Sequence, residues 1–459
     1  MTLVVGEAPV AAIAGVLVGL LVIAGLIYGA ISQYRTSQAA IAEKRRRAAE
    51  EQAAERERAA TEAREAAGPA RSAFEAQRRR VREERPALVG ASRGLLADLG
   101  ARWTDTTLLV PDAWLLPHPV HLAPGSGDLR VQTSGEPGQR PVGAVRGAFA
   151  AAAPPREDGT PYPHVVDAIK ELEAPAPSRY VDRDCYRPRS LRIDDGRVEL
   201  LLDRTTYFAL LDEAVPLECE LAAAASRDPL DPGAIDAGPP LPLRAVLGDP
   251  FDLAARTGGV SIDTLVVRRA ADGTGEFWLH RRRAVGMVGG QTHVVPAGVF
   301  QPAVDGLDEV FERDAEPWHA IMRELAEELL GVWDADSRAL APDAYETEEP
   351  LRSLEAARRG GTVRPWLVGL GLDPLSLWLE LLAVLVIDAE TFDTLVGEPP
   401  RENGEGTVLG RTRPDGSHGG HPFTAAGLDE ALADPALAPA ADGLLRLAAR
   451  HRETLLAEG

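Results

Sequence analysis

Two stretches decide the fold: TLVVRRAADGTGEFWLHRRRAVGMVGGQTHVVPAGVF at residues 264–300 and PWHAIMRELAEELL at residues 317–330. The first begins with a run of Thr, Leu and Val that predicts a strand over 264–269. A turn rich in Asp and Gly then leads into a returning strand over 276–281. Residues 293–300 predict another strand that ends in a tight Pro-Ala-Gly turn. The second stretch predicts an amphipathic helix.

The predicted helix carries three glutamates on one face. Glu324, Glu327 and Glu328 are three and four positions apart, so they lie within one helical turn of each other. Their mutual repulsion favours a cation, and clustered carboxylate oxygens are the ligands that Mg²⁺ or Mn²⁺ prefers. The alternative is a solvated acidic face on a helix whose other face packs on a core through Ile321, Met322, Leu325 and Leu329.

In this context the helix resembles the signature of the Nudix family, Arg-Glu-hydrophobic-x-Glu-Glu. The resemblance implies an α/β/α sandwich and Mg²⁺-dependent (or Mn²⁺-dependent) cleavage of a nucleoside diphosphate linked to another group. It also implies that Glu327 and Glu328 are the principal metal ligands, with Glu324 in the same cluster. Arg323 would orient a glutamate by ion pairing, and Gly298 would be the opening glycine of the motif.

The signature departs from the family pattern. Arg323 follows Gly298 by 25 positions, a longer spacing than in the family. Ala315 stands where the family has an upstream glutamate, so we expect a substitute from Glu309, Glu312 or Glu316. Two functions therefore remain open. One is a phosphohydrolase (pyrophosphatase), and the other is a catalytically inactive Nudix-like protein that senses a nucleotide or scaffolds partners.

Arginines follow the returning strand. Arg281 and Arg283 belong to an Arg-Arg-Arg run that precedes the 293–300 strand. We expect them to meet substrate phosphates at the mouth of the site, alongside Gly298. The alternative is a solvated turn.

The rest of the C-terminal part agrees with a Nudix-like domain over residues 251–459. Residues 377–387 form a long apolar run that predicts a central strand. Residues 400–422 predict a Gly-rich polar loop. Thr424 is a predicted cap for the helix that follows it, and residues 440–456 predict a last amphipathic helix.

Residues 101–250 predict a mixed α/β region. An Asp-Gly turn joins predicted strands at 190–193 and 198–202. An apolar helix is expected from there to about residue 225, and the proline-rich residues 226–250 predict a linker or an ordered loop.

The N-terminus predicts a membrane anchor. Residues 9–31 contain no charged side chain, and a helix of that length spans about 30 Å of hydrocarbon. A cleaved signal peptide is the alternative, but it would have a basic start and a shorter apolar run. Residues 1–8 would be a short extracytoplasmic end.

The charges beside the apolar run predict its orientation. Arg35 and the basic cluster at residues 44–47 follow the span, and no Lys or Arg precedes it. This bias places the C-terminal body in the cytoplasm, under the cell membrane, with residues 9–31 in contact with lipid.

A charged helical stalk is expected over residues 32–100. Ala, Glu, Arg, Lys and Gln dominate its first part, and Gly68-Pro69 should break or kink it before a second helix over residues 70–99. The pattern favours a self-supporting helix and also permits a weak parallel homodimer through anchor and stalk.

The net charge of −21 argues against nucleic acid as a partner, so the expected ligand is a small nucleotide. The sequence indicates an α+β protein.

Overall fold

The computed structural model describes residues 8–96, 106–122, 124–137, 143–173, 180–225, 241–283, 289–332, 340–341, 343–413 and 415–457. The predicted end of the stalk at 97–100 and the linker core at 226–240 lie outside these residues. The chain forms two compact units. The N-terminal unit comprises Met1–Gly68 with Glu157–Gly159, and the second unit, called the body below, comprises Pro69–Arg156 and Thr160–Gly459.

The N-terminal unit is mostly helix. Helix α1 (Ala8–Leu96) begins in it and contains one segment long and apolar enough to cross a membrane. Its large apolar side chains are exposed, with Leu21 at 71% and Leu26 at 70% of their full surface. Within this unit, Arg64 Nε lies 3.5 Å from Glu157 Oε2. A helix so apolar and so exposed needs lipid or another apolar surface around it.

Helix α1 does not break at Gly68-Pro69, so that prediction is wrong. The helix runs through Pro69 and departs from helical geometry at Glu84 instead, where φ is −120° and ψ is 17°. Glu84 lies two residues before Pro86, whose ring crowds the preceding turn. At Pro69 the surrounding strong helix formers tolerate the loss of one hydrogen bond.

The predicted stalk also extends too far. Residues 69–96 of α1 belong to the body, where Phe74, Val81, Leu88 and Val89 are buried. The stalk therefore ends at Gly68 rather than at residue 100. The burial of residues 69–96 could not be predicted from the sequence, because their buried face includes arginines, which are usually solvated.

The body is built on a seven-stranded mixed sheet with the order β1-β10-β11-β5-β6-β15 and β9 on the free part of β5. Strand β5 (Val260–Arg269) runs parallel to β11 (Leu379–Asp388), and β10 (Val363–Leu372) runs antiparallel to β11. Both β5 and β11 are almost wholly buried, as strands covered on both faces should be, and β11 is mostly apolar. The remaining strands are β1 (Val120–His121), β6 (Gly275–Phe277), β9 (Ala297–Val299) and β15 (His421–Pro422).

Smaller sheets accompany it. A three-stranded antiparallel sheet joins β12 (Gly406–Leu409), β7 (Leu279–Arg282) and β8 (Thr292–Val294). A short pair joins β13 (Arg411–Thr412) and β14 (His418–Gly419). Residues 400–422 therefore contain four short strands, so the prediction of a plain loop is wrong; many glycines and few apolar residues concealed them.

The predicted hairpin in the middle region is confirmed. Strands β3 (Asp184–Asp194) and β4 (Arg197–Thr206) pair antiparallel around Asp195-Gly196, and β2 (Leu129–Pro137) joins β4. Both turn residues have positive φ, 47° and 77°, which Asp and Gly tolerate. Helix α4 (Tyr207–Ala224) follows, and the Thr206 hydroxyl caps it by accepting from the Ala209 N–H.

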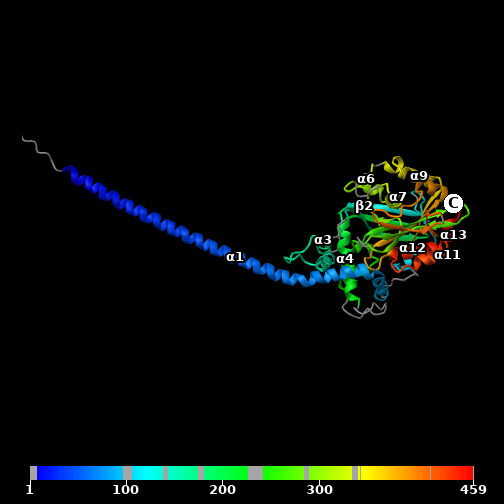
Figure 1. The fold of residues 1–459 in the computed structure, drawn as a ribbon, viewed down its shortest axis with the longest axis horizontal. Helices are drawn as coiled ribbons and strands as arrows, with labels where there is room; N and C mark the ends of the chain where they lie inside the picture. Colours follow the sequence, from blue (N-terminus) through cyan, green and yellow to red (C-terminus); the bar gives the residue numbers. More distant parts are fainter. Residues whose placement is uncertain are drawn as a thin grey trace, which may run out of the picture. The chain divides into compact units, whose positions relative to one another are not determined.

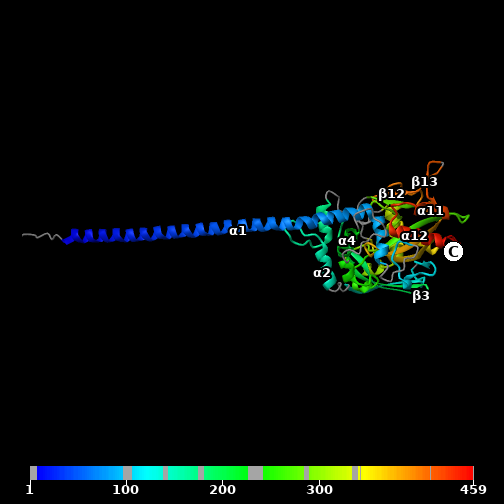
Figure 2. The ribbon, with the colours of Figure 1, turned by 90° about the horizontal axis from the view of Figure 1, so that it is seen from below.

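Helices cover both faces of the main sheet. Figure 1 shows α6 (Asp308–Arg313), α7 (Pro317–Glu328) and α9 (Leu351–Arg359) above it, with α11 (Ala425–Leu432), α12 (Pro439–Arg450) and α13 (Arg452–Leu456) below. Figure 2 shows α4 and α2 (Gly143–Ala152) at the opposite end of the body from α11 and α12. The other helices are η2 (Asp112–Trp114), α3 (Val165–Leu172), α5 (Pro242–Leu247), η3 (Leu253–Ala255), α8 (Ala344–Thr347) and α10 (Ala389–Leu395).

The α+β class is thus confirmed, together with the long apolar N-terminal helix. The cap at Thr424 is confirmed as well, since its hydroxyl accepts from the Gly427 N–H. The predicted division at residue 250 is not a boundary between compact units, because β1 and β11 share one sheet. The Nudix-like sandwich stays a prediction.

Candidate carboxylate site

Helix α7 brings two of the three predicted glutamates, Glu324 and Glu328, against strand β9. Pro317 opens the helix, and its apolar face, which includes Ile321 and Leu325, is fully buried. This packing turns Glu324 toward Gly298, so closely that a Cβ at Gly298 would lie 2.5 Å from the Glu324 carboxylate. A side chain at position 298 would displace the Glu324 carboxylate, and the role of Gly298 in the signature stays a prediction.

Glu328 is the most buried of the three glutamates, with 1% of its surface exposed. Its Oε1 atom accepts from Arg282 Nη2 at 2.9 Å and from the Ala297 N–H at 3.4 Å. Burial raises the pKa of Glu328, and the neighbouring Arg282 charge opposes this. Its Oε2 atom lies 3.7 Å from His280 Nδ1, and among the described residues neither atom has a hydrogen-bond partner.

Arg282, which the sequence named only as the middle residue of the Arg-Arg-Arg run, is the cation of this cluster. Besides Glu328, its guanidinium contacts the Ala297 carbonyl oxygen and the Glu405 carboxylate. The position of Arg282 on β7 explains why it points toward the glutamates. Side chains alternate along a strand, so Arg282 lies on the same inner face as His280. That alternation was available in the sequence, but the register of the strand was not.

A loop before β12 closes the cluster. Asn403 donates from Nδ2 to the Glu328 carbonyl oxygen at 2.9 Å, and its Oδ1 lies 3.1 Å from His280 Nε2. The same Oδ1 accepts from the N–H groups of Glu405 and Gly406. Asn403 therefore positions both the C-terminal end of α7 and the backbone at Glu405.

The α7 glutamates influence each other's ionisation. Burial, with the added charges of Glu327 and Glu328, raises the pKa of Glu324 to about 8. Burial and the Arg282 charge lower the pKa of His280 to about 4, so this imidazole is neutral near pH 7. Such shifts accompany functional sites more often than ordinary surfaces.

Arg323 is paired, but with an aspartate. Its Nη1 lies 3.4 Å from Asp314 Oδ2, and its Nη2 donates to the Gln301 carbonyl oxygen at 2.7 Å. Asp314 thus takes the place expected for a glutamate, while Glu309 and Glu312 are exposed on α6 and Glu316 faces Arg358. Burial disfavours the charge on Asp314, yet the Arg323 charge lowers the pKa of this carboxyl. The expectation of a glutamate partner is corrected accordingly.

The predicted phosphate contacts, Arg281 and Arg283, lie apart from the α7 carboxylates. Arg281 Nη2 lies 3.0 Å from Asp434 Oδ2, and Arg283 Nη2 donates to the Asn403 carbonyl oxygen at 3.4 Å. Their role with a substrate stays a prediction.

A pair of buried carboxyl groups lies beside the cluster on β5 and β11. A hydrogen bond between the two carboxyl groups favours the charged form of Asp263 and the protonated form of Glu380. Burial raises the pKa of Asp263 to about 7, and burial with the Asp263 charge raises the pKa of Glu380 well above its ordinary value. His293 Nε2 lies 3.7 Å from Asp263 Oδ1.

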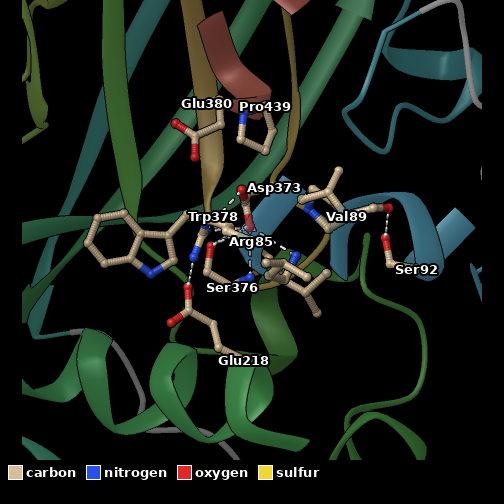
Figure 3. Close-up of polar contacts among 12 residues, drawn as sticks. Arg85, Val89, Ser92, Glu218, Asp373, Ser376, Trp378, Glu380 and Pro439 are labelled. Atoms are coloured by element: carbon tan, nitrogen blue, oxygen red, sulfur yellow. Dashed lines mark hydrogen bonds and ion pairs between the residues drawn. The ribbon is translucent and has the colours of Figure 1, made fainter. Parts of the chain in front are cut away.

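Arg85 of α1 ties a second buried cluster together. Figure 3 shows its guanidinium between Glu218 and Asp373, with Trp378 and Glu380 nearby. Arg85 Nη1 donates to Glu218 Oε1 at 2.6 Å, and Nη2 donates to both Asp373 oxygens at 3.3 Å. Asp373 in turn accepts from the backbone of the turn before β11.

The side chains at this site are of the chemical type that binds a hard divalent cation. Glu324, Glu327 and Glu328 offer carboxylate oxygens, and the unpartnered Glu328 Oε2 is buried at the same place. Across the described ranges, no three His, Cys, Asp or Glu side chains are grouped so as to hold a metal ion.

Comparison with known proteins places the chain in no family. No family model matches it, and no curated protein matches it either.

Proposed function

We propose that this chain is a membrane-anchored Nudix-type hydrolase that cleaves a nucleoside diphosphate derivative. The observation that carries the proposal is the α7 carboxylate face, seated on the β9 glycine. Glu324 lies against Gly298, and Glu328 holds an unpartnered oxygen at the same edge. Acidic residues of a merely solvated helix face would point to water instead.

The α7 glutamates would hold Mg²⁺ or Mn²⁺. Such an ion, when bound, neutralises the charge of a diphosphate and activates water. Two contacts within the chain hold the glutamates in position. The Arg323–Asp314 ion pair fixes the start of the helical turn that carries the glutamates, and Asn403 fixes the end of that turn through the Glu328 carbonyl oxygen. His280, neutral near pH 7, adds a buried ring nitrogen that faces Glu328.

The membrane part of the proposal rests on the N-terminal unit. An apolar helix with no charge over residues 9–31 and basic residues directly after it favours a single span with the body in the cytoplasm. The enzyme would then act on a cytoplasmic nucleotide close to the inner face of the cell membrane.

One observation favours a second function. Arg282 already neutralises Glu328, which a metal-dependent enzyme would leave for its cation. The second candidate is therefore a catalytically inactive Nudix-like protein that senses a nucleotide or scaffolds partners at the membrane.

The experiment is a hydrolysis screen on the full chain in detergent micelles with millimolar Mg²⁺. A panel of nucleoside diphosphate derivatives is offered, and release of a phosphate-bearing product is measured. Glu328→Gln should abolish turnover, whereas Glu312→Gln, on exposed α6, should leave it unchanged. Equal rates in wild type and Glu328→Gln would refute the assignment, and nucleotide-dependent stabilisation without turnover would favour the second candidate.

A further inference from the structure

The guanidinium of Arg282 lies among the oxygens that a metal ion would use. Its Nη2 atom donates to Glu328 Oε1 at 2.9 Å and to the carbonyl oxygen of Ala297. Its Nη1 atom contacts Glu405. These three acceptors come from α7, β9 and the loop before β12, and in the described part of the chain they converge on this one guanidinium.

We propose that Arg282 is an internal counter-cation of the carboxylate site and must leave it before a divalent metal binds to Glu328. The proposal rests on the proposed function, because it concerns the metal ligands assigned there. It adds a regulatory step: metal occupancy and Arg282 occupancy exclude each other.

Charge balance explains the exclusion. Glu328 is 1% exposed, and a buried carboxylate needs a cation or a proton near it. An arginine is always charged, so it supplies that cation without any metal. A divalent ion at the same oxygens would approach the guanidinium closely, and the repulsion between the two cations would be strong in this poorly solvated place.

The contacts of Arg282 also leave it displaceable. Its Nε atom has no hydrogen-bond partner among the described residues, and Glu405 retains 34% of its side-chain exposure. The guanidinium can therefore follow Glu405 toward solvent while Glu328 stays behind on α7.

The two flanking arginines serve as internal controls. Arg281 and Arg283 have the same charge and lie one residue away on either side. Arg281 lies on β7 and Arg283 directly follows it, and their guanidinium groups contact Asp434 and the Asn403 carbonyl oxygen instead of Glu328. An effect of overall charge would appear in all three positions, whereas counter-cation behaviour belongs to Arg282 alone.

The test measures Mn²⁺ binding to the full chain in detergent, by electron paramagnetic resonance of free Mn²⁺ and by calorimetry. Arg282→Gln should bind Mn²⁺ at least tenfold more tightly than wild type, and Arg281→Gln and Arg283→Gln should bind as wild type does. The gain should disappear in the double variant Arg282→Gln with Glu328→Gln. Arg282→Lys, which keeps the charge but loses the planar fork, should gain about threefold in affinity, and this variant decides the matter if Arg282→Gln does not fold.

Two results would overturn the inference. The first leaves the proposed hydrolase standing, and the second removes it as well. If wild type binds Mn²⁺ and turns over substrate while Arg282→Gln and Arg282→Lys bind no more tightly, only the counter-cation role fails. If neither wild type nor any Arg282 variant binds Mn²⁺, the metal site fails, and the proposed hydrolase fails with it.

Discussion

The carboxylate of Glu324 lies directly against the backbone of Gly298. A Cβ at that glycine would lie 2.5 Å from all three atoms of the carboxylate group. The carboxylate end of Glu324 fills the space that a side chain at position 298 would occupy, so the glycine allows this contact between α7 and β9.

Gly298→Ala should therefore displace the Glu324 carboxylate and destabilise the body by about 1 kcal/mol. This is the low end of the cost of overpacking, because the crowded atoms are the flexible end of a side chain and not backbone. Metal-dependent turnover should fall with it. Gly404→Ala is the matched control, because a Cβ at Gly404 meets nothing within 4 Å. Urea unfolding and the hydrolysis assay check both effects, and an equal response of the two variants would contradict the stated contact.

Arg85→Met should destabilise the body strongly. It removes the partner of two buried carboxylates, Glu218 and Asp373, and breaking a buried ion pair costs about 3–5 kcal/mol. Arg79→Met, on the exposed side of the same helix, should change the free energy of unfolding by less than about 0.5 kcal/mol. A small effect at Arg85 would mean that residues 69–96 are not held in this way.

The Asp263–Glu380 pair predicts a pH dependence of stability. Burial raises the pKa of Asp263 to about 7, and burial together with the Asp263 charge raises the pKa of Glu380 well above its ordinary value. Between about pH 4 and 7 the folded protein keeps a proton that the unfolded chain has released, so this pair's contribution falls as pH rises through that window.

Glu380→Gln should flatten that slope while keeping a hydrogen-bond donor for Asp263. The measurement is urea unfolding of wild type and variant from pH 4.5 to 8, in which the contributions of His280 and His293 are common to both proteins. Glu199→Gln, at an exposed position of β4, should retain the wild-type slope. A Glu380→Gln protein with the wild-type slope would show that the pair does not hold the proton.

Two truncations test the boundary at Gly68. Removing residues 1–68 should leave a folded body that no longer sediments with membranes. Removing residues 1–96 should prevent folding, because it strips Phe74, Val81, Leu88 and Val89 from the core and unpairs Glu218. Circular dichroism and membrane flotation distinguish these results. A folded 97–459 fragment would contradict the assignment of residues 69–96 to the body.

Local patterns allowed much of the fold to be predicted. The Asp-Gly hairpin, the helix over 317–328 and the central strand β11 each follow from a few neighbouring residues. Helix α1 shows where this reasoning stops. Arginines such as Arg78 and Arg85 are solvated in most helices, and only distant partners on α3 and α4 make them buried here.

The candidate site shows the same limit. The three glutamates share a face because of helical spacing alone, so they could be found from the sequence. Arg282 could be distinguished from Arg281 and Arg283 only by the register of β7 against its neighbours. Arg323 pairs with Asp314 and not with an upstream glutamate, and the number of residues between Gly298 and Arg323 does not specify how that segment folds.

The most direct test of the central claim is Mg²⁺-dependent product release by the full chain in detergent, measured for wild type and Glu328→Gln on one panel of nucleoside diphosphate derivatives. The proposed hydrolase predicts turnover of at least one derivative by wild type and a loss of at least a hundredfold in Glu328→Gln. Turnover that is equal in both proteins, or absent from wild type and Arg282→Gln alike, would contradict it.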